Sequence, residues 1–444
     1  MTPFARLYVP AALDEAVSGS SWLEAMLEVE RALAAAGAHV GVVPASAARS
    51  IAEACAAGGY DWDTLLDEAR EAGTPAEPLV RALVERVGED GGRWVHLGAT
   101  SQDVIDTAAI LVARRALDLV LRELTRVAEA CATLAGTHRA TPMAGRTLLQ
   151  QAVPTTFGLK SAGWLVAALD VRARLRQLRE HGLAAQLGGA AGTLSGLGEQ
   201  GLEVAAQFAR ELGLAEPTVP WHANRVRIAE LGAALAIAAG VVAKIATDLV
   251  LLAQTEVGEV REGGAGGGSS TMPHKRNPVN AMWARAGAEL AHGHASVLTR
   301  APASEHERGA GAWQAEWEAL SAALATTGGA AAALARALET LEVDTERMRS
   351  NLELTGGRLG SERIALRLTE LRGRTAAHAL VREACARADA AGRPLAEELA
   401  ALDPELTVAE VREALDPAAN LGSAGPLVDR ALARYEAERK ERGA

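Results

Sequence analysis

The residues best suited to chemistry lie in one glycine-rich segment, Gly263–Pro278. Glycine occupies five of the six positions from 263 to 268, so this backbone can turn its N–H groups toward an anion. Two serines follow, and cationic and amide side chains come soon after them: Ser269, Ser270, His274, Lys275, Arg276 and Asn277. A flexible linker has no use for so many directed hydrogen-bonding groups, so we predict a mobile loop that binds an anion and takes part in catalysis. The spacing of a phosphate-binding P-loop is absent.

Three further polar segments interrupt the chain and complement this loop. In His96–Asp103, the hydroxyls of Thr100 and Ser101 stand at the entrance to a helix, where backbone N–H groups can receive a carboxylate. An ordinary helix N-cap is the alternative interpretation of this segment. Gly145–Pro154 is a polar stretch that leads into the next helix, and Trp221–Arg227 is more typical of a helix N-terminus than of a site.

The elements that must position these segments are helices. Alanine dominates the apolar residues and aromatic residues make up only 3%, a composition that favours helix over strand. No stretch shows sustained alternation of apolar and polar residues, whereas helical spacing recurs through the chain. The expected helices, several of them unusually long, span residues 22–36, 108–134, 155–180, 226–259, 280–298 and 313–341. We therefore predict an all-α fold with a central bundle of very long helices.

Two glycine-rich polar breaks, at 88–101 and 354–361, divide the chain. At 444 residues it exceeds the size at which one hydrophobic core keeps growing, so more than one domain is expected. We predict an N-terminal helical domain over 1–105, a central long-helix domain over 106–354 that carries the glycine–serine loop, and a C-terminal helical domain over 355–444. A bundle of such elongated helices buries its exposed seam by self-association, so a homo-oligomer is expected.

Composition also excludes several classes of protein. The net charge of −11 argues against a general nucleic-acid binder. The N-terminus lacks the basic start and apolar run of a signal peptide, and the most apolar window, 231–243, is too short to span a bilayer. Cys55, Cys131 and Cys385 lie far apart without a CxxC pair, which predicts free thiols in a reducing compartment. We expect a cytoplasmic protein with no membrane or nucleic-acid partner.

On these motifs the chain resembles the fumarase/aspartase superfamily, which includes argininosuccinate and adenylosuccinate lyases. The loop Gly-Ser-Ser-Thr-Met-Pro-His-Lys-Arg-Asn-Pro, residues 268–278, is similar to the long signature of that superfamily. The resemblance extends along the whole chain, through His96–Thr107, Arg146–Pro154, Gly188–Thr193 and Arg349–Glu362. It implies three helical domains, a homotetramer around a shared bundle of long helices, active sites formed by several subunits, and no metal or organic cofactor.

The resemblance also implies roles for particular residues. Ser269 matches the catalytic serine of the superfamily, which moves a proton at the carbon next to a substrate carboxylate. An unperturbed serine is a poor base, so nearby positive charge and backbone N–H groups must activate it, with Lys275 and the glycine N–H groups as candidates. The substrate is a small polycarboxylate, and the side chains expected to bind it are those of His96, Thr100, Ser101, Gln151, Asn224, Lys275, Asn277 and Arg308.

Within the superfamily, the chain is more similar to the cycloisomerases than to the purine or amino-acid lyases. The segments that carry this similarity are 98–103, 254–259, 305–308, 313–317 and 420–424. The resemblance implies a reaction in which a tricarboxylate of protocatechuate breakdown is lactonised, with one of its own carboxylates as the nucleophile.

Gln151 bears on the choice of reaction. Many relatives carry histidine where this chain has Gln151, and glutamine donates a hydrogen bond but cannot relay a proton. A carboxylate leaving group needs no proton, so Gln151 disfavours a lyase that expels an amine. The alternatives are another lyase of the superfamily, acting on adenylosuccinate or a substituted succinate, and a catalytically silent homologue. Ser269, Lys275 and Asn277 together argue against the silent homologue.

Overall fold

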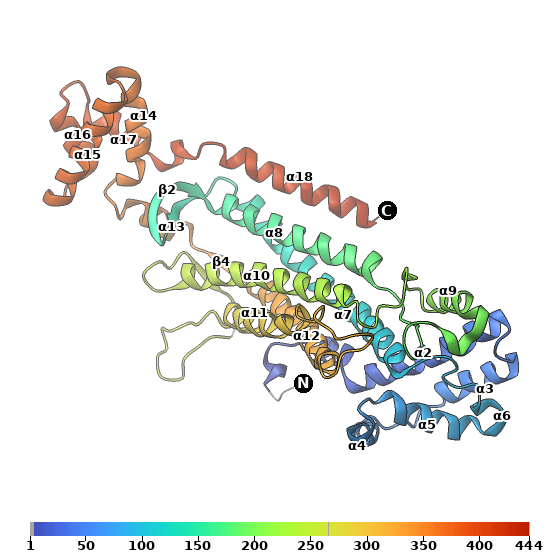
Figure 1. Cartoon of the computed structure of the whole chain (residues 1–444). Coiled ribbons are helices and arrows are strands. Elements are labelled where there is room, and N and C mark those ends of the chain that lie inside the picture. The colour runs from blue at the N-terminus through green and yellow to red at the C-terminus, as the bar shows by residue number, and fades with distance from the viewer. Residues whose placement is uncertain (1–3, 265, 444) are drawn as a thin grey trace. The chain divides into compact units, whose positions relative to one another are not determined.

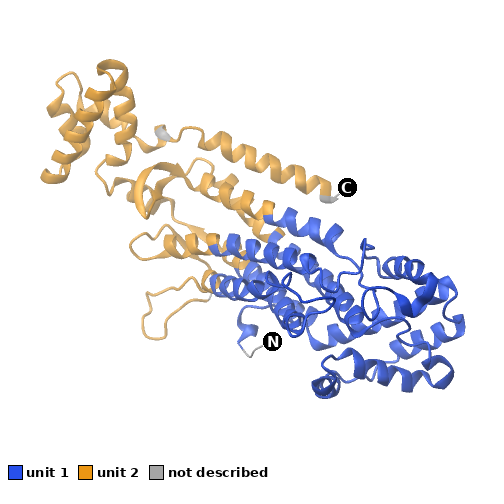
Figure 2. Ribbon diagram, in the orientation of Figure 1, with its two compact units in different colours: residues 1–124, 171–243, 283–333 blue, residues 125–170, 244–282, 334–444 orange. Residues whose placement is uncertain are grey.

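The computed structural model describes residues 4–264 and 266–443, and helices dominate it (Figure 1). The prediction of an all-α fold is confirmed. The chain packs into two compact units, each assembled from three stretches of sequence (Figure 2). Unit 1 comprises residues 1–124, 171–243 and 283–333, and unit 2 comprises residues 125–170, 244–282 and 334–444. The division into three consecutive domains stays a prediction.

Five long helices are the main elements, and the boundary between the units falls inside each of them. They are α7 (Ser101–Thr137), α8 (Phe157–Gln177), α10 (Val226–Ala253), α11 (Val279–Leu298) and α12 (Ala312–Glu339). Alanine and leucine, which lose little side-chain freedom in a helix, fill many of their buried positions, and no proline interrupts them. The expected long helices are confirmed, although α10 ends before residue 259 because the chain turns there and Gly258 has a φ of 61°.

Unit 1 also contains the N-terminal helices. Its other elements are η1 (Ala5–Leu7), α1 (Ala11–Ala16), α2 (Gly19–Val40), α3 (Ala45–Ala56), α4 (Trp62–Ala72), α5 (Ala76–Val87), α6 (Glu89–Gly92), the π-helix η2 (Leu178–Gly182), η3 (Ser195–Gln200) and α9 (Gly201–Leu212). Helix α2 begins after Ser18, whose side chain accepts the N–H of Ser21, and ends at Gly41, whose φ of 91° forms a left-handed cap. Buried apolar residues pack this part of the unit together: Ala34, Ile51, Ala54, Leu83 and Val95.

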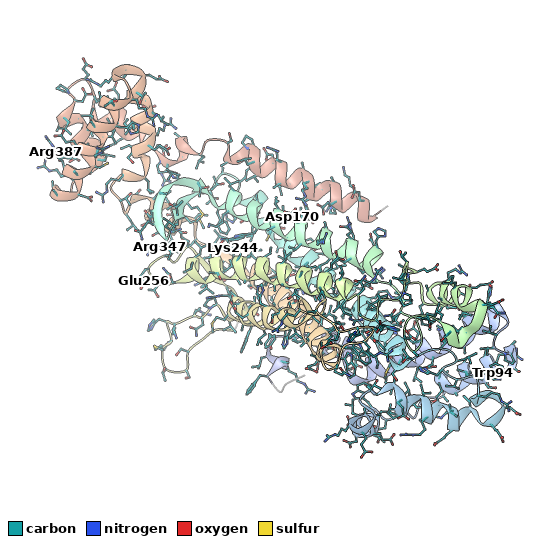
Figure 3. All side chains as sticks on the ribbon, in the orientation of Figure 1. Trp94, Asp170, Lys244, Glu256, Arg347 and Arg387 are labelled. Carbon is teal, nitrogen blue, oxygen red and sulfur yellow. The ribbon has the colours of Figure 1, made fainter. Side chains whose placement is uncertain are left out.

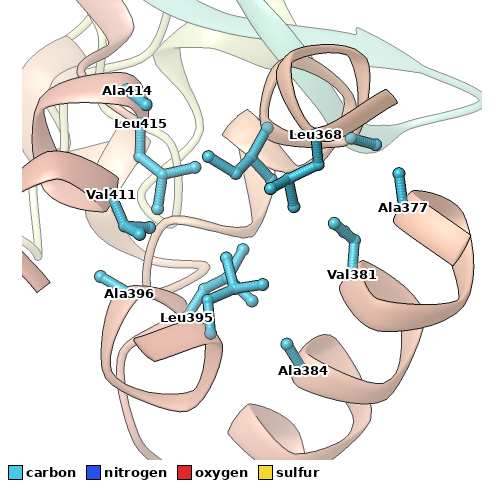
Figure 4. Packing of buried hydrophobic residues seen from close by; sticks show 12 residues of the cluster. Leu368, Ala377, Val381, Ala384, Leu395, Ala396, Val411, Ala414 and Leu415 are labelled. Atoms are coloured by element: carbon cyan, nitrogen blue, oxygen red, sulfur yellow. The ribbon is translucent and has the colours of Figure 1, made fainter. Parts of the chain in front are cut away.

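In its described residues, unit 2 also contains four short strands and the C-terminal helices. These elements are β1 (Pro142–Thr147), β2 (Gln150–Thr156), β3 (Val260–Glu262), β4 (Leu341–Val343), α13 (Thr345–Glu353), η4 (Arg358–Gly360), α14 (Ser361–Arg372), α15 (Arg374–Ala391), α16 (Leu395–Leu402), α17 (Val408–Ala414), η5 (Pro417–Asn420) and α18 (Ala424–Gly443). Figure 4 shows the core that holds α14 to α17 together, which includes Leu368, Val381, Leu395, Val411 and Leu415. A capping box between Thr407 and Glu410 fixes the start of α17.

Strands β1 and β2 form an antiparallel hairpin in which Thr147 pairs with Gln150. This hairpin lies where the sequence predicts only a polar stretch before a helix, and the expected helix start at residue 155 is two residues early because β2 continues to Thr156. Leu148 and Leu149 form the two-residue turn, with φ values of 51° and 63°. Positive φ at both central positions is the type I′ pattern, which normally selects Asn-Gly rather than two leucines. Both leucine side chains are exposed, so packing does not account for the strained backbone.

Replacing Leu148 by asparagine together with Leu149 by glycine is expected to raise the free energy of unfolding by about 1–2 kcal/mol, because these residues adopt a positive φ at lower cost. Urea unfolding followed by circular dichroism measures the change. Leu371→Asn is the control, since Leu371 is as exposed as Leu149 but lies in the regular helix α14. A hairpin variant that gains no stability over wild type would contradict the strain at this turn.

Helix α10 is the most apolar long helix. By length and composition it could cross a membrane, since an 18-residue window has a mean hydropathy of 2.1, although the core helices of soluble proteins meet the same criterion. The apolar helix is longer than the expected window 231–243, and the pair Lys244–Asp248 lies within it as an ion pair one turn apart. Less than half of the window is buried in this chain, which leaves an apolar surface on a helical fold typical of soluble enzymes.

Candidate active site

The predicted site residues fall into two groups, one in each unit. Unit 2 holds Gln151, Ser269, Lys275 and Asn277, and unit 1 holds His96, Thr100, Ser101, Asn224 and Arg308. The two groups are described separately below, beginning with the glycine–serine loop.

Ser269 lies half-buried in the glycine–serine loop of unit 2. The backbone N–H of Met272 donates a hydrogen bond of 3.2 Å to Ser269 Oγ, and the Thr271 hydroxyl lies 3.4 Å from the same oxygen. A donor aimed at the serine oxygen stabilises its anionic form, which is what a serine base requires. The N–H group at the serine oxygen is that of Met272, whereas the sequence pointed to Lys275 and the glycine N–H groups as candidates.

The loop is closed on itself between Gly267 and Asn277. The carbonyl oxygen of Gly267 accepts the Asn277 backbone N–H at 2.8 Å and its side-chain Nδ2 at 3.1 Å. A Cβ atom on Gly267 would lie 2.3 Å from the Asn277 carbonyl oxygen, and the φ of Gly267 is 81°, so only glycine fits here. In this structure the Asn277 amide thus holds the loop, in addition to the substrate-binding role predicted for it.

A cavity of about 1010 Å³ lies beside the loop in unit 2. The loop residues on its wall include Lys275, Arg276 and Asn277, and acidic residues around the β3–β4 ladder, among them Glu256 and Asp344, also line it. The Lys275 ammonium forms no ion pair with any residue that the structure describes. Lys275 is exposed, so its charge is available to an anionic ligand that enters the cavity.

One carboxylate and one arginine hold the backbone around the cavity. Glu262 accepts the N–H groups of Asn280 and Ala281 at 3.0 and 2.7 Å, which ties β3 to the N-terminus of α11 directly after the loop. Arg347 donates to the carbonyl oxygens of Glu256 and Val257 at the turn that follows α10, and Figure 3 labels Glu256 and Arg347 in this region. The two ends of the loop therefore rest on fixed backbone.

Gln151 belongs to a buried polar network in unit 2. Its Nε2 donates to the carbonyl oxygen of Asn351 at 3.0 Å, while its Oε1 is buried without a hydrogen-bond partner among the described residues. Asn351 in turn donates to Glu259, and Arg146 forms two hydrogen bonds of 2.6 and 2.9 Å to the same carboxylate. The network fixes the direction of the Gln151 amide, and Arg146 and Glu259 are polar site neighbours that the sequence analysis did not assign.

In unit 1, His96 is paired with a buried acid. Its Nδ1 lies 2.6 Å from Glu30 Oε1, and the Glu30 side chain is fully buried whereas that of His96 is 19% exposed. Burial alone would lower the pKa of His96, but the Glu30 carboxylate outweighs it and raises the pKa above its usual value. The backbone of His96 has a φ of 58°, an uncommon conformation for a side-chain-bearing residue.

Thr100 and Ser101 lie at the start of α7, as predicted, in a segment held by Asp103. The Asp103 carboxylate accepts the N–H groups of Thr100, Gly188 and Gly189, each at 2.9 Å, and lies 2.6 Å from His222 Nε2. The Thr100 N–H is therefore already satisfied within the chain, so its hydroxyl and that of Ser101 are the groups left for a substrate. Asp103 and His222 were not among the predicted site residues.

Arg308 and Asn224 have protein partners of their own. Arg308 Nε donates to Gln102 Oε1 at 2.8 Å, and the Gln102 amide donates to the His222 carbonyl oxygen at 2.9 Å. Arg308 is thus fixed beside the start of α7, with part of its guanidinium directed to the Ala190 carbonyl oxygen.

Asn224 is exposed, and its side chain accepts the Val226 N–H at 3.5 Å, in keeping with the helix N-terminus expected there.

A buried ionic network lies behind this part of unit 1. Arg225 donates to Asp106 at 2.7 and 3.0 Å and to Glu316 at 3.1 and 3.2 Å, and all three side chains are at least 95% buried. Trp313 Nε1 donates to Asp106 as well, at 2.9 Å. Burial raises the pKa of Glu316, and Arg225 opposes that rise. The network fixes α7, the start of α10 and α12 to one another within unit 1.

One feature of the sequence indicates the polar residues of unit 1 that were not predicted as site residues. Asp103, Asp106 and Thr107 are polar residues at the start of a long, otherwise apolar helical segment, and such residues must find partners when the helix is buried. Their long-range partners lie 79 to 207 residues away in sequence, so the pairing itself cannot be read from spacing. No group of three or more His, Cys, Asp or Glu side chains among the described residues is arranged to hold a metal ion.

Two family models match the chain. One is described as "Lyase" and covers residues 11–291, and the other is described as "Adenylosuccinate lyase C-terminus" and covers residues 357–431. The chain therefore belongs to the lyase family of the fumarase/aspartase superfamily, and the resemblance inferred from the loop is confirmed.

Individual relatives are similar over nearly their whole length. The chain is 47% identical to 3-carboxy-cis,cis-muconate cycloisomerase from Pseudomonas aeruginosa, with 98% of this chain and 96% of that protein covered. It is also 47% identical to nitrosuccinate lyase from Streptomyces davaonensis, over 95% of this chain and 92% of that protein. The crystal structure of 3-carboxy-cis,cis-muconate lactonizing enzyme from Pseudomonas putida matches with a TM-score of 0.92 and 41% identity, over 98% of this chain and 99% of that one.

Proposed function

We propose that this protein is a cytoplasmic 3-carboxy-cis,cis-muconate cycloisomerase, which interconverts 3-carboxy-cis,cis-muconate and 4-carboxymuconolactone in the breakdown of aromatic compounds. The observation that carries the proposal is the closed loop that presents Ser269, with a backbone N–H at its oxygen and the exposed charge of Lys275 in the same loop. Several relatives that bear this name, at 41–47% identity over nearly the full chain, support the substrate.

The proposed reaction includes the transfer of a proton at the carbon next to a substrate carboxylate. In the lactonising direction, one substrate carboxylate oxygen forms a C–O bond to a carbon of the double bond, and the electron pair moves to the neighbouring carbon and its carboxylate. Ser269 Oγ then gives its proton to that carbon. In the reverse direction Ser269 removes the same proton and the C–O bond breaks. The Met272 N–H stabilises the serine oxygen, and Lys275 is the cation proposed to assist it.

The remaining predicted residues are proposed to bind the three substrate carboxylates. Lys275 supplies a cation from the loop, and the Thr100 and Ser101 hydroxyls supply donors at the N-terminus of α7, where the helix dipole favours an anion. His96 supplies a second cationic donor. Asn277, Arg308, Asn224 and Gln151 already have partners within the chain, so they are proposed to contact substrate with the donors that those partners leave free.

A second candidate is a substituted-succinate lyase that acts on nitrosuccinate. It is favoured by the 47% identity to nitrosuccinate lyase, which equals the identity to the cycloisomerase. Gln151 does not separate the two reactions, because nitrite, like a carboxylate, leaves as an anion that needs no proton. Proton removal next to a carboxylate by Ser269 would serve both.

The test is a direct comparison of substrates by absorbance. With purified enzyme, 3-carboxy-cis,cis-muconate is expected to lose the ultraviolet absorbance of its conjugated diene. Nitrosuccinate, assayed by a colour reaction for released nitrite, and adenylosuccinate, assayed by its own absorbance change, are expected to turn over at least a hundredfold more slowly by kcat/KM. Faster turnover of nitrosuccinate would replace the cycloisomerase by the second candidate, and turnover of adenylosuccinate alone would contradict both.

We further propose a homotetramer whose active sites are shared between subunits. Apolar side chains on α10 and α11 support it, because Ile237, Met282 and Leu290 are each more than 40% exposed and α10 is apolar along much of its length. Light scattering after size-exclusion chromatography is expected to give four times the 46.0 kDa chain mass. Ile237→Glu is expected to shift the protein toward smaller species, and a wild-type monomer would overturn the proposal.

A further inference from the structure

Outside the glycine–serine loop, the feature that the proposed reaction leaves unexplained is the buried carboxylate of Glu30. Its side chain is fully buried in α2, and of its two oxygens only Oε1 has a hydrogen-bond partner among the described residues, His96 Nδ1 at 2.6 Å. Oε2 is buried without a hydrogen-bond partner among the described residues. A buried carboxylate with one oxygen unsatisfied costs stability, and an apolar side chain at this position would avoid that cost.

The conformation of His96 carries a cost too. Its φ of 58° places a side-chain-bearing residue in the left-handed region, and Gly98, two residues later, has a φ of 74°. A Cβ atom on Gly98 would lie 2.4 Å from Leu197, so this turn is packed closely. Strain of this kind persists where the surrounding structure imposes it, and here it directs Nδ1 of His96 at Glu30.

The hydrogen bond to Glu30 decides which ring nitrogen is available. Because a carboxylate oxygen only accepts, Nδ1 must carry a proton in this contact, which leaves Nε2 as the second ring nitrogen. No described residue bonds to Nε2, and His96 is partly exposed, so Nε2 is the end of the ring that a ligand can reach. When the ring is cationic, Nε2 donates to an anion; when it is neutral, Nε2 can only accept.

We propose that Glu30 is a positioning residue for His96, which it holds as a cation with Nε2–H presented to a carboxylate of the substrate. This inference rests on the proposed function only for the identity of the ligand, since any polycarboxylate substrate would meet the same donor. Glu30 itself does not touch substrate. Through its contact with His96 it fixes a positively charged donor at the edge of the site.

The charged groups around the pair fit this arrangement. Asp103 on α7 adds to the effect of Glu30 and raises the pKa of His96 further, although it is itself bonded to His222. Cys55 on α3 interacts electrostatically with Glu30, and burial raises the pKa of its thiol to about 12, so it stays neutral near pH 7. Arg31, which follows Glu30 on α2, opposes this rise and lowers the pKa of Cys55.

The test follows His96 directly in the full-length enzyme. Hydrogen–deuterium exchange at the imidazole Cε1, resolved by peptide mass spectrometry across pH 5 to 10, gives the pKa of each histidine without any substrate. Glu30→Gln, which keeps the shape of the side chain and removes its charge, is expected to lower the pKa of His96 by about one unit or more. Glu30→Asp is expected to retain most of the wild-type value.

The matched control is Glu28→Gln. Glu28 lies on the same helix and pairs with Arg115 at 2.6 Å, so it tests removal of a carboxylate that does not contact His96. Circular dichroism and thermal unfolding of each variant show whether it is folded. An unchanged His96 titration in a folded Glu30→Gln variant would overturn the proposal, as would an equal shift in the Glu28 control.

Activity supplies the second readout. Because cationic His96 is the form that binds, kcat/KM of wild type is expected to fall as pH rises through the pKa of His96. In Glu30→Gln this fall is expected about one pH unit lower, with roughly tenfold loss of kcat/KM on the alkaline side, mainly through KM, and recovery toward wild type at low pH. A shifted titration with an unshifted pH profile would overturn the role in substrate binding. Failure of the proposed function looks different, since wild type itself would then not turn over 3-carboxy-cis,cis-muconate.

Discussion

Ser269→Ala is expected to lower kcat by about 10²- to 10⁴-fold while KM changes little, because the variant keeps the carboxylate-binding groups and loses the oxygen that carries the proton. In the structure that oxygen accepts the Met272 N–H, and the loop is closed elsewhere, through Gly267 and Asn277. The substitution therefore removes the chemistry without opening the loop. Steady-state kinetics on 3-carboxy-cis,cis-muconate, followed by loss of diene absorbance, measures the effect.

Ser270→Ala is the matched control for this experiment. Ser270 is the next residue, carries the same hydroxyl and is exposed, and its side chain forms no hydrogen bond with any residue that the structure describes. It is expected to retain kcat within about threefold, well short of the loss for a group that transfers a proton. Full activity in Ser269→Ala, or equal losses in both variants, would contradict the assignment of the proton to Ser269.

Arg225→Met is expected to have the largest effect on stability, a loss of about 3–5 kcal/mol in the free energy of unfolding. Arg225 is 98% buried and is the cation shared by Asp106 and Glu316, so its removal leaves two buried carboxylates without their countercharge. Protonation of Glu316, whose pKa burial already raises, will relieve part of this penalty at low pH. The loss is therefore expected to be smaller at pH 5 than at pH 8.

Urea unfolding at the two pH values checks this prediction. Arg179→Met is the control within unit 1, because Arg179 pairs with Asp118 at the surface, where solvent screens the charges. Its loss is expected to be several times smaller and nearly independent of pH. A loss for Arg225→Met no larger than that of the control would show that the buried network contributes little to the fold.

Much of the fold could be predicted because long helices leave a periodic pattern along the chain. The segments 108–134 and 280–298 already show the apolar spacing of helices α7 and α11. The β1–β2 hairpin could not be predicted in this way. Its strands are short and pair with each other, so neither shows sustained alternation, and its turn is Leu148-Leu149, which lacks the usual Asn-Gly signal.

The residues of the candidate site also differ in whether neighbouring sequence or long-range packing determines their role. Ser269 and Lys275 could be predicted because both lie in one short polar loop, and the residue types of that loop indicate an anion-binding site. Glu30 could not, since it is one polar residue in an amphipathic helix and its partner His96 lies 66 residues later. Arg225 was likewise placed at a helix start, and only the packing of α7 and α12 within unit 1 makes it the centre of a buried network.

The most direct test of the central claim, a proton delivered by the loop serine next to a carboxylate, is the product formed in D₂O. Because a serine hydroxyl exchanges with solvent, turnover of 3-carboxy-cis,cis-muconate is expected to give 4-carboxymuconolactone with one deuterium at the carbon next to the carboxylate. Proton and deuterium magnetic resonance of the isolated lactone measures it, with Ser269→Ala forming the lactone about 10²- to 10⁴-fold more slowly than wild type. Lactone without deuterium at that carbon, or no lactone from wild type, would contradict the account.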